Sequence, residues 1–308
     1  MDPIQAIHPE KDTTLALLLE AQRRGFELYY MEIQQLFLQY GNAWGNCCEL
    51  QVYNDIERWY SLSTPIARPL DQFDVVLMRK DPPFTMEYLY STYILERAEL
   101  NGTLVINKPQ SLRDANEKMF ATWFPQCMPP TLVTALKSQL KSFAEEYRCI
   151  VLKPLDSMGG ENVFRCNFDD PNLNMIIEFL TMRGKRYVMA QQFIPEISEG
   201  DKRILLIDGQ PIPYALARVP AHDDFRGNLV AGAKGVGREL TERDWWICGQ
   251  VGPLLREKGL SFVGIDVIGD YLTEVNVTSP TCVRELEREF QIDISGKVLD
   301  NIMEKLNG

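Results

Sequence analysis

Histidine is almost absent from the sequence, which contains only His8 and His222. That scarcity argues against hydrolases that use a Ser-His or Cys-His pair and against zinc enzymes that bind the metal through imidazole. The seven cysteines are an odd number and, apart from Cys47 and Cys48, they are scattered without a metal-binding spacing. This usage fits a reduced compartment, and we expect a cytoplasmic protein.

Long apolar runs and an excess of positive charge are missing as well. No stretch reaches the roughly 18 apolar residues of a membrane-spanning helix, and the first residues lack the pattern of a signal peptide. The formal net charge of -11 argues against nucleic acid as a partner, because nonspecific binding to nucleic acid depends on clustered lysine and arginine. We therefore expect neither a membrane nor a nucleic acid partner.

The remaining composition is that of a globular protein. The chain has 308 residues, 45% hydrophobic and 24% charged, which is enough for two or three packed subdomains. Helical spacing of apolar residues alternates with strand patterns, and this alternation predicts an α/β fold. The helices are expected at 13–24 and 86–98, and the strands at 27–31, 73–78 and 103–106.

Cations follow two of these elements. Arg79 and Lys80 come directly after the strand at 73–78, at the end where open α/β sheets bind ligands. A plain turn explains them equally well. Further along, Ser111 and Asp114 are expected to open a helix that contains Lys118.

The segment 149–165 reads as a strand, a glycine-bearing turn and a second strand. Lys153 interrupts the apolar first strand, and Gly159 and Gly160 allow backbone N–H groups to approach an anion. The segment resembles a phosphate-binding loop, although it lacks the Gly-Lys-Ser/Thr of a Walker loop. A simple hairpin turn is the alternative.

A hairpin is predicted at Asp208-Gly209, between two apolar runs. With a two-residue turn Arg203 lies opposite Tyr214, so Arg203 and Arg218 share one face and suggest an anionic ligand. Solvated strand faces are the alternative. The glycine-rich stretch 219–239, which includes Arg226, is interpreted as a mobile lid that excludes water, or alternatively as disordered surface.

The segment 262–281 places oxygen ligands within two apolar strands, where charge is costly. Asp266 lies in the first strand, and Glu274 and Asn276 share a face of the second, a donor set that suits Mg²⁺. A regular two-residue turn at Gly269-Asp270 would set Asp266 and Glu274 on opposite faces. A three-residue loop or a bulge would pair them, and ordinary hairpin strands with polar residues facing water are the alternative.

The turn after these strands carries hydroxyl groups and a cation at the start of a helix. Such a helix start is suited to binding a carboxylate. The residues concerned are Ser279, Thr281 and Arg284. Cys282 lies among them and is expected to be a buried thiol, because the sequence offers no base to activate it.

Taken together, these motifs resemble bacterial glutathione synthetases of the ATP-grasp superfamily. The matching stretches follow the family order over nearly the whole chain and are 77–84, 107–114, 152–156, 200–203, 217–218, 226–228 and 272–281. The resemblance implies an ATP-grasp fold behind a Rossmann-like N-terminal domain. Family members usually have a strand ahead of the position of Met1, and this sequence does not contain it. It also implies three units, 1–117 for substrate, 118–190 as a lid and 191–308 as the catalytic domain with the mobile loop.

The resemblance further implies a reaction and a role for each site residue. The family joins γ-glutamylcysteine to glycine with ATP and Mg²⁺ (or Mn²⁺), through an acyl phosphate, in homotetramers. ATP would be held by Lys118, Lys153, Gly159, Gly160, Gln191, Gln192, Phe193, Ile194 and Asp201, and the metal by Asp266, Glu274 and Asn276. Lys153, Arg203 and Arg226 would be catalytic, and the substrate residues would be Arg79, Arg218, Arg226, Ser279, Thr281 and Arg284.

Two other functions are compatible with the sequence. One is a different ATP-grasp carboxylate–amine ligase, of the dipeptide ligase type. The other is a regulator that binds ATP without turnover, which the presence of Lys153, Arg203, Glu274 and Asn276 disfavours.

Overall fold

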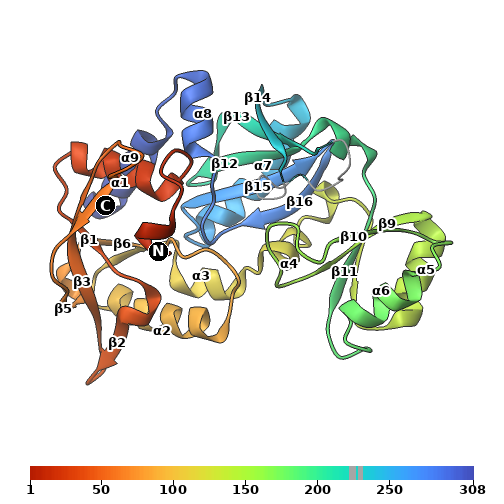
Figure 1. The fold of residues 1–308 in the computed structure, drawn as a ribbon, viewed down its shortest axis with the longest axis horizontal. Coiled ribbons are helices and arrows are strands. Elements are labelled where there is room, and N and C mark those ends of the chain that lie inside the picture. Colours follow the sequence, from red (N-terminus) through yellow and green to blue (C-terminus); the bar gives the residue numbers. More distant parts are fainter. Residues whose placement is uncertain (222–226, 228–231) are drawn as a thin grey trace.

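The N-terminal part of the chain builds two sheets that share one core. The computed structural model describes residues 1–221, 227 and 232–308 (Figure 1). A parallel pair of strands is flanked by helices, as the alternating pattern predicted, and an antiparallel sheet packs beside it. The parallel pair is β6 (Val75–Leu77) and β7 (Leu104–Ile106); the antiparallel strands are β1 (Leu28–Tyr30), β2 (Leu36–Gln39), β3 (Asn42–Val52), β4 (Tyr60–Leu62) and β5 (Ile66–Pro69).

Side-chain caps fix where the N-terminal helices begin. Asp12 accepts a hydrogen bond from the backbone of Leu15 at 2.6 Å, and Thr85 caps the next long helix in the same way. These helices are α1 (Thr13–Arg23) and α2 (Met86–Leu100). The single helix expected from Ser111 through Lys118 is wrong: the chain forms α3 (Pro109–Asp114) and then α4 (Glu117–Ala121), because the backbone leaves helical geometry at Ala115 and Asn116 caps the second helix.

A small four-stranded sheet follows, with two helices on one face. Its strands lie in the order β10-β9-β11-β8, and the helices bury leucine and isoleucine side chains against it. The strands are β8 (Thr131–Thr134), β9 (Cys149–Pro154), β10 (Phe164–Asn167) and β11 (Val188–Gln192); the helices are α5 (Lys137–Tyr147) and α6 (Leu173–Leu180). The predicted glycine-bearing turn connects β9 to β10.

The last sheet has five antiparallel strands in the order β14-β13-β12-β15-β16. Aliphatic side chains such as Ile204, Val263 and Ile265 join the core on the face that α7 covers, and the opposite face carries charged residues. The strands are β12 (Asp201–Ile207), β13 (Gln210–Val219), β14 (Lys234–Glu239), β15 (Phe262–Ile268) and β16 (Tyr271–Asn276); the helices are α7 (Glu242–Glu257), α8 (Val283–Phe290) and α9 (Ile294–Asn307).

Two details of this sheet differ from the prediction. The Asp208-Gly209 turn forms, but a bulge between Ile204 and Leu206 shifts the register, so Arg203 lies opposite Leu216 and not Tyr214. The shift is by two residues, so the faces are preserved. Part of the stretch 219–239, which was expected to be a loop, is the strand β14 paired with β13. Residues 222–226 and 228–231, Arg226 among them, lie outside the described residues.

The final helix returns to the beginning of the chain. In Figure 1 α9 lies beside α1, far from the small sheet. Arg24, at the end of α1, forms an ion pair with Asp300 of α9 at 2.6 Å and donates to the backbone oxygen of Gly296. Val298, Leu299 and Ile302 complete a core with residues of α1. Within the described residues, no helix is long and apolar enough to cross a membrane.

The glycines of α7 give a direct test of how this helix packs against the five-stranded sheet. A Cβ on Gly252 would come within 2.2 Å of the backbone oxygen of Gly209, in the tight turn between β12 and β13. We expect Gly252→Ala to lower the free energy of unfolding by about 1–3 kcal/mol, because backbone must move to admit the methyl group. Denaturant unfolding measures this change.

The matched control lies on the same helix. Gly249 has open space at its Cβ position, so Gly249→Ala should raise the free energy of unfolding by about 0.5–1 kcal/mol through helix propensity alone. Equal effects of the two substitutions would contradict the packing of α7 on this turn.

Candidate active site

A deep cavity separates the small sheet from the five-stranded sheet. It encloses about 820 Å³ of empty space, partly open to solvent, which is the size of a typical cofactor site. Both sheets and α4 contribute its wall. Residues predicted to bind ATP or metal that line it are Lys118, Lys153, Gly159, Gly160, Gln191, Gln192, Phe193, Ile194, Asp201, Asp266 and Glu274.

The two carboxylates of the last hairpin lie side by side. The turn at Gly269-Asp270 has two residues, yet a bulge after Asp266 restores the pairing, so Asp266 stands directly opposite Glu274. Gly264 stands opposite Asn276 on the same face. The bulge is one of the two arrangements that the shared site required, and it brings the predicted donor set together.

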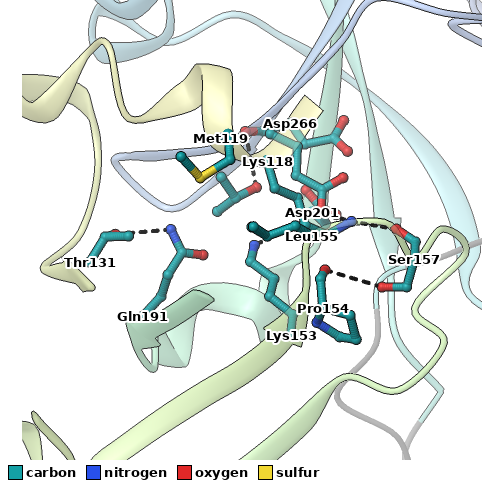
Figure 2. Close-up of polar contacts among 12 residues, drawn as sticks. Lys118, Met119, Thr131, Lys153, Pro154, Leu155, Ser157, Gln191, Asp201 and Asp266 are labelled. Carbon is teal, nitrogen blue, oxygen red and sulfur yellow. Dashed lines mark hydrogen bonds and ion pairs between the residues drawn. The ribbon is translucent and has the colours of Figure 1, made fainter. Parts of the chain in front are cut away.

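Two buried lysines point at Glu274 from different elements. The Nζ atom of Lys118, on α4, is 3.6 Å from the Glu274 carboxylate, and that of Lys153, on β9, is 3.8 Å away. Figure 2 shows both lysines extending into the same space. Lys118 also donates to the backbone oxygen of Ser157 in the glycine-bearing turn. Burial lowers the pKa of Lys153, and Glu274 opposes that shift. Cations confined in this way are suited to holding an anion.

Two arginines contact the Asp266 carboxylate. Arg203 donates from Nε at 2.5 Å and from Nη2 at 3.0 Å, and Arg218 approaches the same carboxylate at 3.0 Å. Although burial opposes ionisation, these arginines hold the pKa of Asp266 well below its usual range. Arg218 also donates to Asp201 at 2.6 Å, where burial raises the pKa to about 7. The cluster is preorganised positive charge beside the cavity.

The part of the cavity wall formed by β11 and the residues after it includes Gln191, Phe193 and Ile194. The Gln191 amide donates to the Thr131 hydroxyl at 3.1 Å, which fixes its orientation on β11 (Figure 2). The Phe193 ring is covered by the Arg165 guanidinium, 3.9 Å from the ring centroid. Ile194 continues this wall. An aromatic and aliphatic slot next to a cationic region is the shape that a nucleotide base and its phosphates require.

The donor set of the last hairpin is a candidate site for a divalent cation. The described residues contain no cluster of three or more His, Cys, Asp and Glu side chains that would hold a metal unaided. Two carboxylates and an amide do meet here, and the Asn276 Nδ2 atom is buried without a hydrogen-bond partner. Because oxygen and nitrogen of an amide are assigned rather than observed, the orphaned atom fits an amide that turns its oxygen to a cation. Mg²⁺ with phosphate oxygens completing its shell fits this set.

Four of the predicted substrate residues that the structure describes are not part of the cavity wall. Arg79 is buried, donating to Thr14 and to the backbone oxygen of Pro280, and its Nη1 atom has no partner among the described residues. The Thr281 hydroxyl oxygen lies 3.4 Å from the Nη1 atom of Arg203, so Thr281 belongs to the arginine cluster. Arg284 instead binds Pro9 and Asn54 at the surface of the N-terminal part, away from the other site residues.

The segment after β16 also contains Ser279 and Cys282. The Ser279 hydroxyl lies 3.5 Å from the backbone oxygen of Arg79. Cys282 is buried, as expected, and burial raises the pKa of its thiol, so it is poorly suited to act as a nucleophile.

The sequence analysis did not identify Glu117, which links α4 to the five-stranded sheet. Its carboxylate accepts hydrogen bonds from the Thr278 hydroxyl at 2.8 Å and from the Thr278 backbone at 3.3 Å. This link holds Lys118 next to the strand that carries Glu274 and Asn276. The sequence shows only an acidic residue in the first turn of a helix, and its partner is 161 positions away, so no local pattern could have revealed the pair.

The fold and this cavity define an ATP-grasp protein. Solved structures of similar fold include the ATP-grasp ligase PsnB with its minimal precursor, Mg and ADP (TM-score 0.61, 19% identity, 95% of this chain and 94% of that one). Another is the D-cycloserine synthetase DcsG (TM-score 0.59, 16% identity, 77% and 85%). At such identities the likeness concerns the fold alone.

Sequence comparisons narrow the class to one family. The N-terminal domain model of prokaryotic glutathione synthetase matches residues 1–113, and the ATP-grasp domain model of the same family matches residues 117–291. Glutathione synthetases from Pseudomonas aeruginosa and Coxiella burnetii are 56% and 57% identical over 99% and 97% of this chain, covering 96% and 93% of the relatives. The chain belongs to the prokaryotic glutathione synthetase family and is an ATP-dependent ligase.

Proposed function

We propose that the cavity between the two sheets is where this ligase joins γ-glutamylcysteine to glycine. A carboxylate oxygen of γ-glutamylcysteine attacks the γ-phosphorus of ATP, ADP leaves, and an acyl phosphate forms. The glycine amine then attacks the acyl carbon, inorganic phosphate leaves, and the amine gives up a proton as the peptide bond forms. The convergence of Lys118 and Lys153 on one buried point beside Asp266 and Glu274 is the observation that carries this proposal.

The side chains of the cavity divide the work by their charge. Lys118 and Lys153 bind the phosphates, Gly159 and Gly160 open the backbone of the loop that covers them, and Asp201 receives the ribose. Both glycines have positive φ, as a backbone turned toward an anion requires. Gln191, Gln192, Phe193 and Ile194 frame the adenine. Phosphoryl transfer is catalysed mainly by positioning and positive charge, so no histidine base is needed.

The arginines act on the charge that develops on the substrate. Arg203 stabilises the transferring phosphoryl group and the tetrahedral intermediate, with Arg218 beside it. Arg226 is proposed to assist from the stretch outside the described residues, and Arg79, Ser279, Thr281 and Arg284 to contribute to substrate binding. Of these last four, Thr281 has direct support, because its hydroxyl contacts Arg203.

Asp266, Glu274 and Asn276 would hold Mg²⁺ or Mn²⁺. The cation would neutralise charge on the phosphates as ADP leaves. The proposal is tested by phosphate release from ATP with γ-glutamylcysteine plus glycine, and in parallel with D-alanine. Release only with the former pair supports it; release only with D-alanine would indicate a dipeptide ligase, and none with any amine would contradict a ligase altogether.

Glu274 provides a test of the metal site. We expect Glu274→Gln to weaken Mn²⁺ binding by at least about 10–100-fold, because loss of even an outer-shell partner costs that much. Paramagnetic resonance titration of Mn²⁺ with a non-hydrolysable ATP analogue measures this without turnover. Glu145→Gln, an exposed acid on α5, is the control. Unchanged Mn²⁺ affinity in Glu274→Gln would remove Glu274 from the metal set.

The organisation of the protein is proposed on the same basis. We propose a substrate-binding unit at 1–117, a lid at 118–190 and a catalytic unit at 191–308, assembled as a homotetramer in the cytoplasm. The sheets change near these boundaries, since β8 to β11 form one sheet and β12 to β16 another. All seven cysteines lie in the described part of the chain and all are free, which supports a reducing compartment.

A further inference from the structure

The outward side of α2 carries a regular apolar stripe. Met86, Tyr90, Tyr93 and Leu100 are 52%, 56%, 48% and 67% exposed, and Arg97 is exposed between the last two. Their spacing of four, three, four and three residues is that of the a and d positions of a coiled coil. The five residues therefore share one side of the helix, and they are referred to below as the α2 stripe.

The other side of α2 is already buried. Tyr88, Leu95 and Ala98 belong to the main core of the protein. The helix is thus apolar on both sides, and helices of that kind are usually covered all round. Within the described residues, the stripe is contacted by the Arg113 guanidinium, 4.5 Å from the Tyr93 ring centroid, and its four apolar side chains still remain about half exposed.

We propose that the α2 stripe is a contact surface for a second copy of this chain, with the two α2 helices antiparallel about a two-fold axis. This inference rests on the proposed homo-oligomer and assigns a surface to it. The charges favour that partner and direction: Glu87 is exposed near the start of the helix and Arg97 near its end. In an antiparallel pair each Glu87 meets Arg97 of the second copy, so the stripe is complementary to itself.

The β2–β3 hairpin extends the same surface. Arg97 donates from Nε to the backbone oxygen of Gly41 at 3.2 Å, which fixes the hairpin tip at the end of the stripe. Next to it Tyr40 is 96% exposed and Leu38 is 49% exposed. A helix of 15 residues spans only about 22 Å, which is short for a stable interface. The hairpin tip supplies further apolar area to the contact.

Sedimentation velocity over a range of concentrations tests this surface. Tyr93→Glu should weaken self-association by about tenfold or more, because it places a charge at the centre of a buried contact. Met175→Glu, at an exposed apolar residue on α6 beside the small sheet, should leave association unchanged. Tyr90→Lys replaces Tyr93→Glu if circular dichroism shows that the latter fails to fold.

The two charged residues test the direction of packing. Glu87→Arg and Arg97→Glu should each weaken association by on the order of tenfold, since each creates two like-charge pairs across the axis. The double variant should restore it. Failure of the double variant to recover would overturn the antiparallel arrangement.

The possible outcomes separate the two proposals. A wild-type protein that stays monomeric overturns both the homo-oligomer and the stripe. A wild-type oligomer whose association is unaffected by Tyr93→Glu and Tyr90→Lys overturns the stripe alone. Ligase activity measured on the same samples reports independently on the catalytic proposal.

Discussion

Replacing Arg203 by alanine is expected to lower kcat for phosphate release with γ-glutamylcysteine and glycine by about 10²–10³-fold. The guanidinium is buried beside the cavity and held bidentately by Asp266, so it is already oriented before charge develops on the substrate. Removing it deletes a preorganised donor that water cannot replace. Steady-state kinetics at saturating ATP measure the loss.

Two further variants show whether geometry or charge is responsible. Arg203→Lys keeps one positive charge but loses the planar fork, so most of the loss should persist. Arg23→Ala removes an exposed arginine on α1 and should leave kcat unchanged. Activity of Arg203→Ala within about threefold of the wild type would contradict the catalytic role, since loss of such a donor costs far more.

Lys153→Met should lower kcat/KM for ATP by about 10²–10³-fold, a loss of the size expected for one preorganised charge. The lysine is buried on β9, 3.8 Å from Glu274, and methionine preserves most of its volume without its charge. The phosphates would then lose one of two converging cations. Kinetics with varied ATP, together with calorimetric binding of an ATP analogue, measure the effect.

The control for this variant is a lysine in the same part of the fold. Lys137, on α5, is half-exposed and pairs with Glu178 at the surface. Lys137→Met should leave kcat/KM for ATP unchanged. If Lys153→Met binds the ATP analogue as tightly as the wild type and turns over normally, the phosphates do not lie where the cavity places them.

Local sequence patterns predicted several helices and turns of the fold. The helices predicted at 13–24 and 86–98 correspond to α1 and α2, because helical spacing and a capping residue are features of residues that are close together in the sequence. The Asp208-Gly209 turn was readable for the same reason. The charged face of the last hairpin was readable only as a conditional prediction, because the sequence does not specify the bulge that pairs Asp266 with Glu274.

Contacts between distant segments could not be read in this way. Arg284 contacts Asn54, 230 positions away, a partner that no local sequence pattern indicates. Glu117 and Thr278 are likewise 161 positions apart, so their contact depends on the tertiary fold. Residue type and spacing identified chemistry that is local to one hairpin or one loop; which groups face a shared cavity depends on how the sheets dock.

The return of α9 to α1 constrains the order in which the protein can mature. During synthesis α1 emerges early, but its partners Val298, Leu299 and Ile302 are made only after all strands of the five-stranded sheet. Until then the side of α1 that includes Ala16, Leu17 and Ala21 lacks part of its cover, and the nascent N-terminal part is a natural client for a chaperone. For the same reason, proteolytic cleavage between α8 and α9 would loosen α1 rather than the five-stranded sheet.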